Sequence, residues 1–163
     1  MLINLARRAA VLALVAVAVA PVAHAQTATQ TVTFAVNAIN QIAFTGTPSL
    51  TITTAVAGSA PTSVTDATAA WAVTTNQTGA KITASIPTAM PTGLTLSAVL
   101  GAPSGGTSAG YLALGTTGVD LVTAITKLAQ GSLAVTYKLD ATAAAGVITS
   151  ATRVVTYTIS GGA

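Results

Sequence analysis

Cysteine and glutamate are absent from the 163-residue chain, and only 6% of its residues are charged. The single histidine, His24, lies in a segment that is interpreted below as a leader. The mature chain therefore lacks most of the side chains that serve as acid–base catalysts, nucleophiles or metal ligands. We expect a protein that is not an enzyme and has no cofactor and no metal site. The lack of cysteine also excludes disulfides, so burial of apolar residues must stabilise the fold.

The few remaining reactive groups form no catalytic pattern. A Ser–Lys pair would have to use Lys81, Lys127 or Lys138, and no strand–turn–helix nucleophile motif accompanies these lysines. The acidic residues are Asp66, Asp120 and Asp140. They are predicted at strand edges or turns, where aspartate is an ordinary turn residue. No acidic loop gathers the oxygen ligands that calcium requires.

Little net charge remains once the leader is removed. The basic residues outside the leader are Lys81, Lys127, Lys138 and Arg153, which exceed the three aspartates by one charge. Binding of nucleic acid needs a basic patch, often with stacking aromatic side chains. Four scattered basic residues do not make such a patch, so we expect no nucleic-acid partner.

Residues 1–25 have the parts of a secretory signal peptide. Two arginines precede an unbroken apolar run at residues 9–20, and small residues precede the expected cleavage point between Ala25 and Gln26. The apolar run is shorter than the roughly 20 residues that a membrane-spanning helix needs. We therefore expect residues 26–163 to be a single exported domain, secreted or held at the surface of a bacterial envelope, with no membrane span.

Alternation of apolar and polar residues dominates the rest of the chain and predicts half-buried β-strands. The polar positions are mostly threonine, which favours strands over helices. The alternating segments are residues 31–39, 50–53, 71–74, 82–86, 94–98, 133–139 and 155–159. Glycine- and proline-containing turns separate them. Seven to nine short strands around one core are typical of an immunoglobulin-like antiparallel β-sandwich.

Two segments of this pattern are harder to interpret. Residues 119–128 fit both a short strand followed by a turn and one face of a helix, and we favour the strand. The glycine-rich segment 101–110 is not followed by a helix, so its amides gain no helix terminus for binding phosphate. We predict that it is a long hairpin loop.

Trp71, Tyr137 and Tyr157 lie at apolar positions of alternating segments. We expect all three in the core, where aromatic side chains bury much apolar area. The alternative is that they are exposed and form a platform for binding sugars.

The two terminal strands lack the features that normally protect sheet edges. Residues 31–39 contain neither charge nor proline, and residues 153–160 carry one charge, at Arg153. Edges of this kind can pair with another chain through backbone hydrogen bonds, the mode called β-strand addition. The alternative is that both strands pair inside their own domain.

The layout resembles that of cysteine-free bacterial fimbrial subunits of the chaperone–usher type, especially the CS1-type pilins. The shared features are the leader, a Thr/Val-alternating segment at residues 31–36, an all-β body and a closing strand at residues 154–159 before a glycine end. The resemblance implies that residues 31–39 are a donor strand that completes a neighbour's fold, with a periplasmic chaperone as a partner. The side chains that would fill the neighbour's groove are Val32, Phe34, Val36 and Ala38.

The sequence therefore predicts an exported, non-catalytic structural subunit that self-associates through its edge strands into a surface fibre or pilus-like polymer. The alternative is a secreted monomeric module that binds a polysaccharide or another surface ligand.

Overall fold

The computed structural model describes residues 24–162, so the predicted leader, apart from its last two residues, lies outside the described residues. The chain divides into two units, residues 1–35 and residues 36–163. In the first unit, residues 24–35 are exposed and belong to no helix or strand. The second unit contains the strands, and it is described by itself below.

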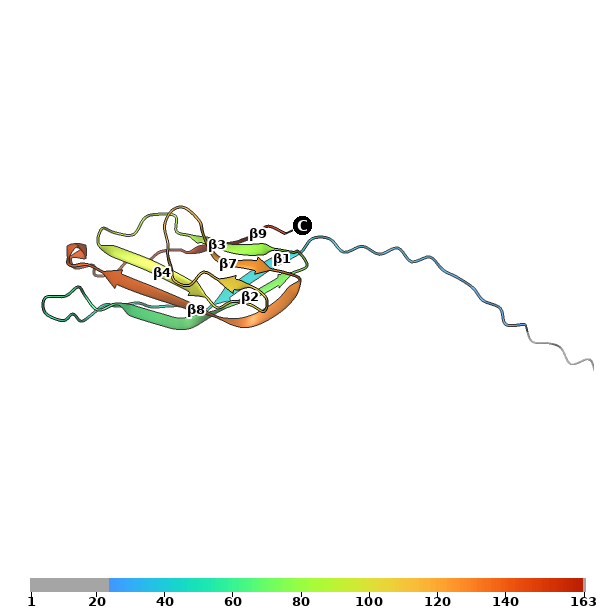
Figure 1. Cartoon of the computed structure of the whole chain (residues 1–163), viewed down its shortest axis with the longest axis horizontal. Coiled ribbons are helices and arrows are strands. Elements are labelled where there is room, and N and C mark those ends of the chain that lie inside the picture. Colours follow the sequence, from blue (N-terminus) through green and yellow to red (C-terminus); the bar gives the residue numbers. More distant parts are fainter. Residues whose placement is uncertain (1–23, 163) are drawn as a thin grey trace, which may run out of the picture. The chain divides into compact units, whose positions relative to one another are not determined.

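The second unit is all-β apart from one short 3₁₀ turn at Ala143–Ala145. Its strands are β1 (Asn40–Thr45), β2 (Val64–Thr75), β3 (Ala80–Ser85), β4 (Leu94–Leu100), β5 (Thr107–Ser108), β6 (Leu112–Ala113), β7 (Val119–Ile125), β8 (Leu128–Ala141) and β9 (Thr156–Ser160). They form a five-stranded sheet in the order β1-β2-β8-β4-β6 and a four-stranded sheet in the order β5-β7-β3-β9 (Figure 1). Every pairing is antiparallel. The expected antiparallel β-sandwich is confirmed.

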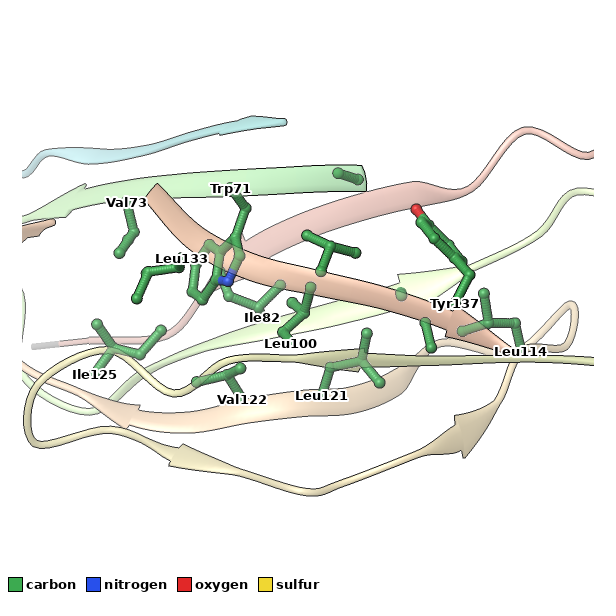
Figure 2. Packing of buried hydrophobic residues seen from close by; sticks show 14 of the residues in the cluster. Trp71, Val73, Ile82, Leu100, Leu114, Leu121, Val122, Ile125, Leu133 and Tyr137 are labelled. Atoms are coloured by element: carbon green, nitrogen blue, oxygen red, sulfur yellow. The ribbon is translucent and has the colours of Figure 1, made fainter. Parts of the chain in front are cut away.

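The core lies between the two sheets, as the alternation predicts. Side chains from both sheets meet there, including Trp71 and Val73 of β2, Ile82 of β3 and Leu121 of β7 (Figure 2). The aromatic prediction is confirmed for Trp71, which is 1% exposed, and for Tyr137, which is 8% exposed. Tyr157 is half-buried and packs against the same cluster.

The chain crosses from one sheet to the other at every connection after β2. The prediction of a long hairpin loop at residues 101–110 is nevertheless confirmed, because β4 and β6, the strands of the five-stranded sheet on either side of that segment, pair antiparallel. The loop also contains β5, which pairs with β7 in the four-stranded sheet. Glycine content predicted the loop but carried no information about the pairing of β5 within it.

Most of the other alternating segments form strands near the predicted places. Residues 119–128 form strand β7 and then a turn, as favoured, with Lys127 at a φ of 42°. Residues 50–53 form no strand. Leu50 still packs against the core, and the Ser49 N–H donates to the Asp66 carboxylate at 2.8 Å. Residues 31–39 also form no strand, and the first strand begins at Asn40.

The two ends of the sandwich differ in the segments that form them. The exit pole is the end where residue 39 joins β1 and where β9 ends, close to the turn at residues 76–79. The loop pole is the opposite end, formed by the β1–β2 loop, the β3–β4 loop and the β8–β9 connection (Figure 1). β1 therefore runs from the exit pole to the loop pole, and β9 runs the other way.

Candidate functional site

Residues 31–39 alternate like a strand in their sequence but have no strand partner among the described residues. Val32, Phe34 and Val36 are 72%, 88% and 78% exposed, and Ala38 is also exposed. Exposed apolar side chains of this size cost free energy in water and gain about 1.5–3 kcal/mol each when fully buried. The candidate donor residues are therefore available for burial against another surface.

The end of this segment is fixed to the exit pole by Asn76. The Asn76 side chain accepts a hydrogen bond from the Ile39 N–H at 2.8 Å and donates one to the Asn37 carbonyl at 2.7 Å. The Asn76 N–H also donates to the Ile39 carbonyl at 3.2 Å. Residues 37–39 therefore continue the line of β1 beyond the sheet.

Strand β1 is an edge strand with an open side. It pairs only with β2 among the described strands, and Ile42 lies opposite Val73 in that register. Antiparallel pairs alternate between residues whose backbone groups face the partner and residues whose groups face away. Because the Ile39 carbonyl faces β2, the N–H and C=O groups of Asn40, Ile42 and Phe44 face the free edge.

Strand β9 is the matching edge of the other sheet. The Ile86 N–H donates to the Gly115 carbonyl on the β7 side of β3, so alternate residues of β3 turn their backbone groups toward β9. Their partners in β9 are Thr156, Thr158 and Ser160. The backbone groups of Tyr157 and Ile159 are therefore left on the free edge.

The free edges of β1 and β9, with their half-buried side chains, are called the seam. Its half-buried apolar residues are Ile42, Phe44, Val155, Tyr157 and Ile159. The rings of Phe44 and Tyr157 stack across it with centroids 3.8 Å apart and an interplanar angle of 14°. At the exit pole the Asn40 side chain donates to the Gly161 carbonyl at 3.4 Å. The two edges thus lie side by side although they belong to different sheets.

A pair of tyrosine hydroxyls joins the seam to the core. The hydroxyls of Tyr137 and Tyr157 lie 2.7 Å apart. Burial raises the pKa of both phenols above the usual 10.0, and the Tyr137 hydroxyl raises the pKa of Tyr157 further. Both groups are therefore neutral at physiological pH and link β8 to β9 by a hydrogen bond.

The opposite side of the sandwich is built differently. Its edge strands, β5 and β6, contain two residues each. Very short edge strands offer few backbone groups to an incoming chain. The seam is therefore the longer of the two open sides, and neither β1 nor β9 carries a charge that would oppose pairing.

The residues considered for catalysis do not come together. The Lys81 ammonium forms an ion pair with Asp120 at 3.0 Å, and Lys138 forms one with Asp140 at 3.0 Å, both partly exposed to solvent. Lys127 lies in the exposed turn before β8. Within residues 24–162 no three His, Cys, Asp or Glu residues converge as metal ligands.

Two of the aspartates organise local structure. Hydrogen bonds from the Ser49 N–H and from the hydroxyl and N–H of Thr68 lower the pKa of Asp66. These bonds hold the bulge at which β2 changes register after Asp66. A hydrogen bond from the Ser63 hydroxyl, with help from Lys138, lowers the pKa of Asp140.

Sequence reasoning missed Phe44 and Asn76, which shape the seam and its approach. Phe44 lies in a short alternating stretch directly after the longer one at residues 31–39. Alternation alone therefore does not show that only the short stretch forms a strand of the sandwich. Asn76 lies in a turn, where asparagine is common for local reasons. Nothing in its sequence context indicates that its side chain reaches back to residues 37 and 39.

The chain was compared with protein-family models, curated proteins and solved structures, and none of them matches. A search of the described helices finds none that is long and apolar enough to cross a membrane.

Proposed function

We propose that this protein is an exported, non-catalytic structural subunit that polymerises by β-strand addition, with residues 31–39 of one copy pairing along the seam of the next. One observation carries the proposal. The same chain contains an exposed, unpaired segment with strand alternation and a seam whose backbone groups and apolar side chains are open to a further strand.

The attachment of the segment favours pairing between copies over pairing within one copy. A strand that folds back beside its neighbour needs at least a two-residue turn. Asn76 holds both Asn37 and Ile39 in line with β1, which leaves no such turn between Asn37 and Asn40. Residues 31–36 therefore reach the seam of a second molecule without disturbing this anchor.

The energetics also support addition of a strand. Burial of Val32, Phe34 and Val36 would contribute about 1.5–3 kcal/mol for each side chain, before the entropy of ordering the segment is counted. Backbone hydrogen bonds to the free edges would add to this. The half-exposed apolar side chains of the seam would be covered by the same event, which explains why they are tolerated in a subunit.

Export is part of the proposal and rests on the leader of residues 1–25. Cleavage between Ala25 and Gln26 would leave a tail of five residues before the donor segment. The first residue of the exported protein tests this step. N-terminal sequencing should begin at Gln26, and a protein that still begins at Met1 would contradict export through a cleaved leader.

Polymerisation is tested by placing the same charge at two neighbouring positions of residues 31–39. Phe34→Asp places a charge on the apolar side of residues 31–39, and Thr33→Asp places the same charge on the polar side. Electron microscopy and size-exclusion chromatography of exported protein should show polymers for the wild type and Thr33→Asp, and monomers for Phe34→Asp. All three should melt at similar temperatures as isolated subunits.

A peptide experiment removes any dependence on an assembly factor. A peptide of residues 26–39 added to monomeric Phe34→Asp protein should raise its melting temperature, whereas the same peptide carrying Phe34→Asp should not. Loss of monomer stability in Phe34→Asp would place the strand inside its own domain. A wild-type monomer that ignores the peptide but shifts on a polysaccharide column would favour a secreted binding module.

A further inference from the structure

The exit pole carries an apolar hollow beside the base of the donor segment. Its volume is about 330 Å³, and its lining includes Ile39, Leu128 and Ala129, with Lys127 on its wall. Most of the lining surface is apolar, although the hollow is open to solvent. Ile39 is both the last residue of the donor segment and part of this lining.

The loop pole carries exposed apolar residues at the other end of the sandwich. Val56 in the β1–β2 loop is 70% exposed, and Val147 and Ile148 in the β8–β9 connection are 96% and 39% exposed. The connection is not a loose end, because the Thr142 N–H donates to the Gly93 carbonyl at 2.8 Å. Val147 thus follows a 3₁₀ turn, Ala143–Ala145, whose beginning is fastened to the neighbouring loop.

The direction of strand addition determines which poles of two copies meet. Because β1 and β9 run in opposite directions, a strand added in the seam is antiparallel to one of them and parallel to the other. If it is antiparallel to β1, residue 39 of the donor reaches the exit pole of the acceptor. The exit pole of the donor copy would then lie against the exit pole of the acceptor copy. Since each copy is donor to one neighbour and acceptor for the other, it would have to contact both neighbours through its exit pole. A growing chain of identical contacts does not allow this.

The other direction has no such conflict. A donor strand antiparallel to β9 runs from the exit pole to the loop pole of the acceptor. Because β1 follows residue 39 without a spacer, the exit pole of the donor copy then lies against the loop pole of the acceptor copy. Each copy uses each pole once, which is the arrangement of an open head-to-tail polymer.

We infer that the loop pole of one copy, led by Val147, covers the exit-pole hollow of the next copy at Ile39, Leu128 and Ala129. This second interface rests on the proposed function, since strand addition brings the poles together. The occupant is another copy of this chain. The contact would make the joint between subunits stiff, because it adds a side-chain interface to a connection that is otherwise one strand wide.

Paired cysteines test the contact directly, because the natural chain has no cysteine. Ala129→Cys protein and Val147→Cys protein are co-assembled and treated with a short thiol cross-linker. The expected product is a 129–147 dimer. The control replaces Ala129→Cys by Ala134→Cys, an exposed position on the outer face of β8, and should give only background cross-linking with Val147→Cys. Dimers joined at 147–147 or equal yields from positions 129 and 134 would overturn the inference.

A charge test uses Lys127 beside the hollow. Val147→Glu and Val147→Lys remove the same apolar contact but place opposite charges near Lys127 of the next copy. Val147→Glu should assemble at a critical concentration about fivefold lower than Val147→Lys at low salt, and high salt should remove the difference. Equal critical concentrations at low salt would overturn the contact.

The failure of this inference is distinguishable from the failure of the proposed function. If the wild type forms polymers but the cysteine variants give no 129–147 cross-link, the pole contact is refuted and strand addition is retained. If the wild type forms no polymer and the peptide of residues 26–39 has no effect, both proposals fail together.

Discussion

The hydroxyl pair of Tyr137 and Tyr157 should give a measurable coupling between the two sheets. A hydrogen bond of 2.7 Å between neutral groups contributes about 0.5–1.5 kcal/mol net. Tyr137→Phe or Tyr157→Phe alone leaves one hydroxyl without this partner, so each should destabilise the domain by about 1 kcal/mol. The double variant should lose little more unfolding free energy than either single variant, because no unpaired hydroxyl remains.

Urea unfolding of monomeric protein, followed by Trp71 fluorescence, measures these free energies in a double-mutant cycle. A coupling of about 1 kcal/mol is expected between the two substitutions. For a domain of this length that corresponds to a few degrees in the melting temperature. If the two single effects simply add, the hydroxyls do not interact in solution, and the link between β8 and β9 that we describe is wrong.

The same pair predicts a dependence on alkaline pH. The pKa of both phenols is raised in the folded state above the usual 10.0, so the folded chain holds these protons more tightly than the unfolded chain. This contribution to stability is complete below pH 10 and is lost as the pH rises above that value. The double Phe variant should lack this loss. An unchanged alkaline decline in the double variant would contradict the assignment.

Two further predictions concern the packing of the sandwich. Trp71→Ala should destabilise the monomer by about 3–5 kcal/mol, and the native tryptophan emission should be blue-shifted, because Trp71 is buried; emission typical of indole in water would move it to the surface. Gly46→Ala should destabilise more than Gly58→Ala. Both glycines have positive φ, but only at Gly46 would the new Cβ lie 2.7 Å from the Ala69 Cα, so equal losses of stability would argue against this close approach.

The fold class was predictable because alternation records which side of a strand faces the core. Trp71 and Tyr137 were placed in the core from this pattern alone, and the structure confirms them. The pattern also changes phase where the chain bulges. At Asp66 the buried side switches from even to odd positions because the carboxylate holds Thr68 in a bulge of β2.

The pairing of strands was much less predictable than their existence. The assignment of β4 and β5 to different sheets depends on contacts between residues far apart in the sequence. Residues 50–53 alternate but form no strand, and the Ser49–Asp66 contact fixes the loop before them. Alternation describes one chain segment, whereas a strand requires a partner at the correct distance.

Residues 31–39 show this distinction most clearly. Their alternation is as regular as that of β3, yet β3 has two partners in the sandwich and residues 31–39 have none among the described residues. A segment whose local pattern and tertiary environment disagree is expected at functional sites, where another requirement overrides stability of the isolated domain. Phe34 is the sharpest case, because a large aromatic side chain at 88% exposure gains nothing from its own domain. A partner supplied by a second copy removes the disagreement without changing a residue, and this is why we favour strand donation over a simple flexible tail.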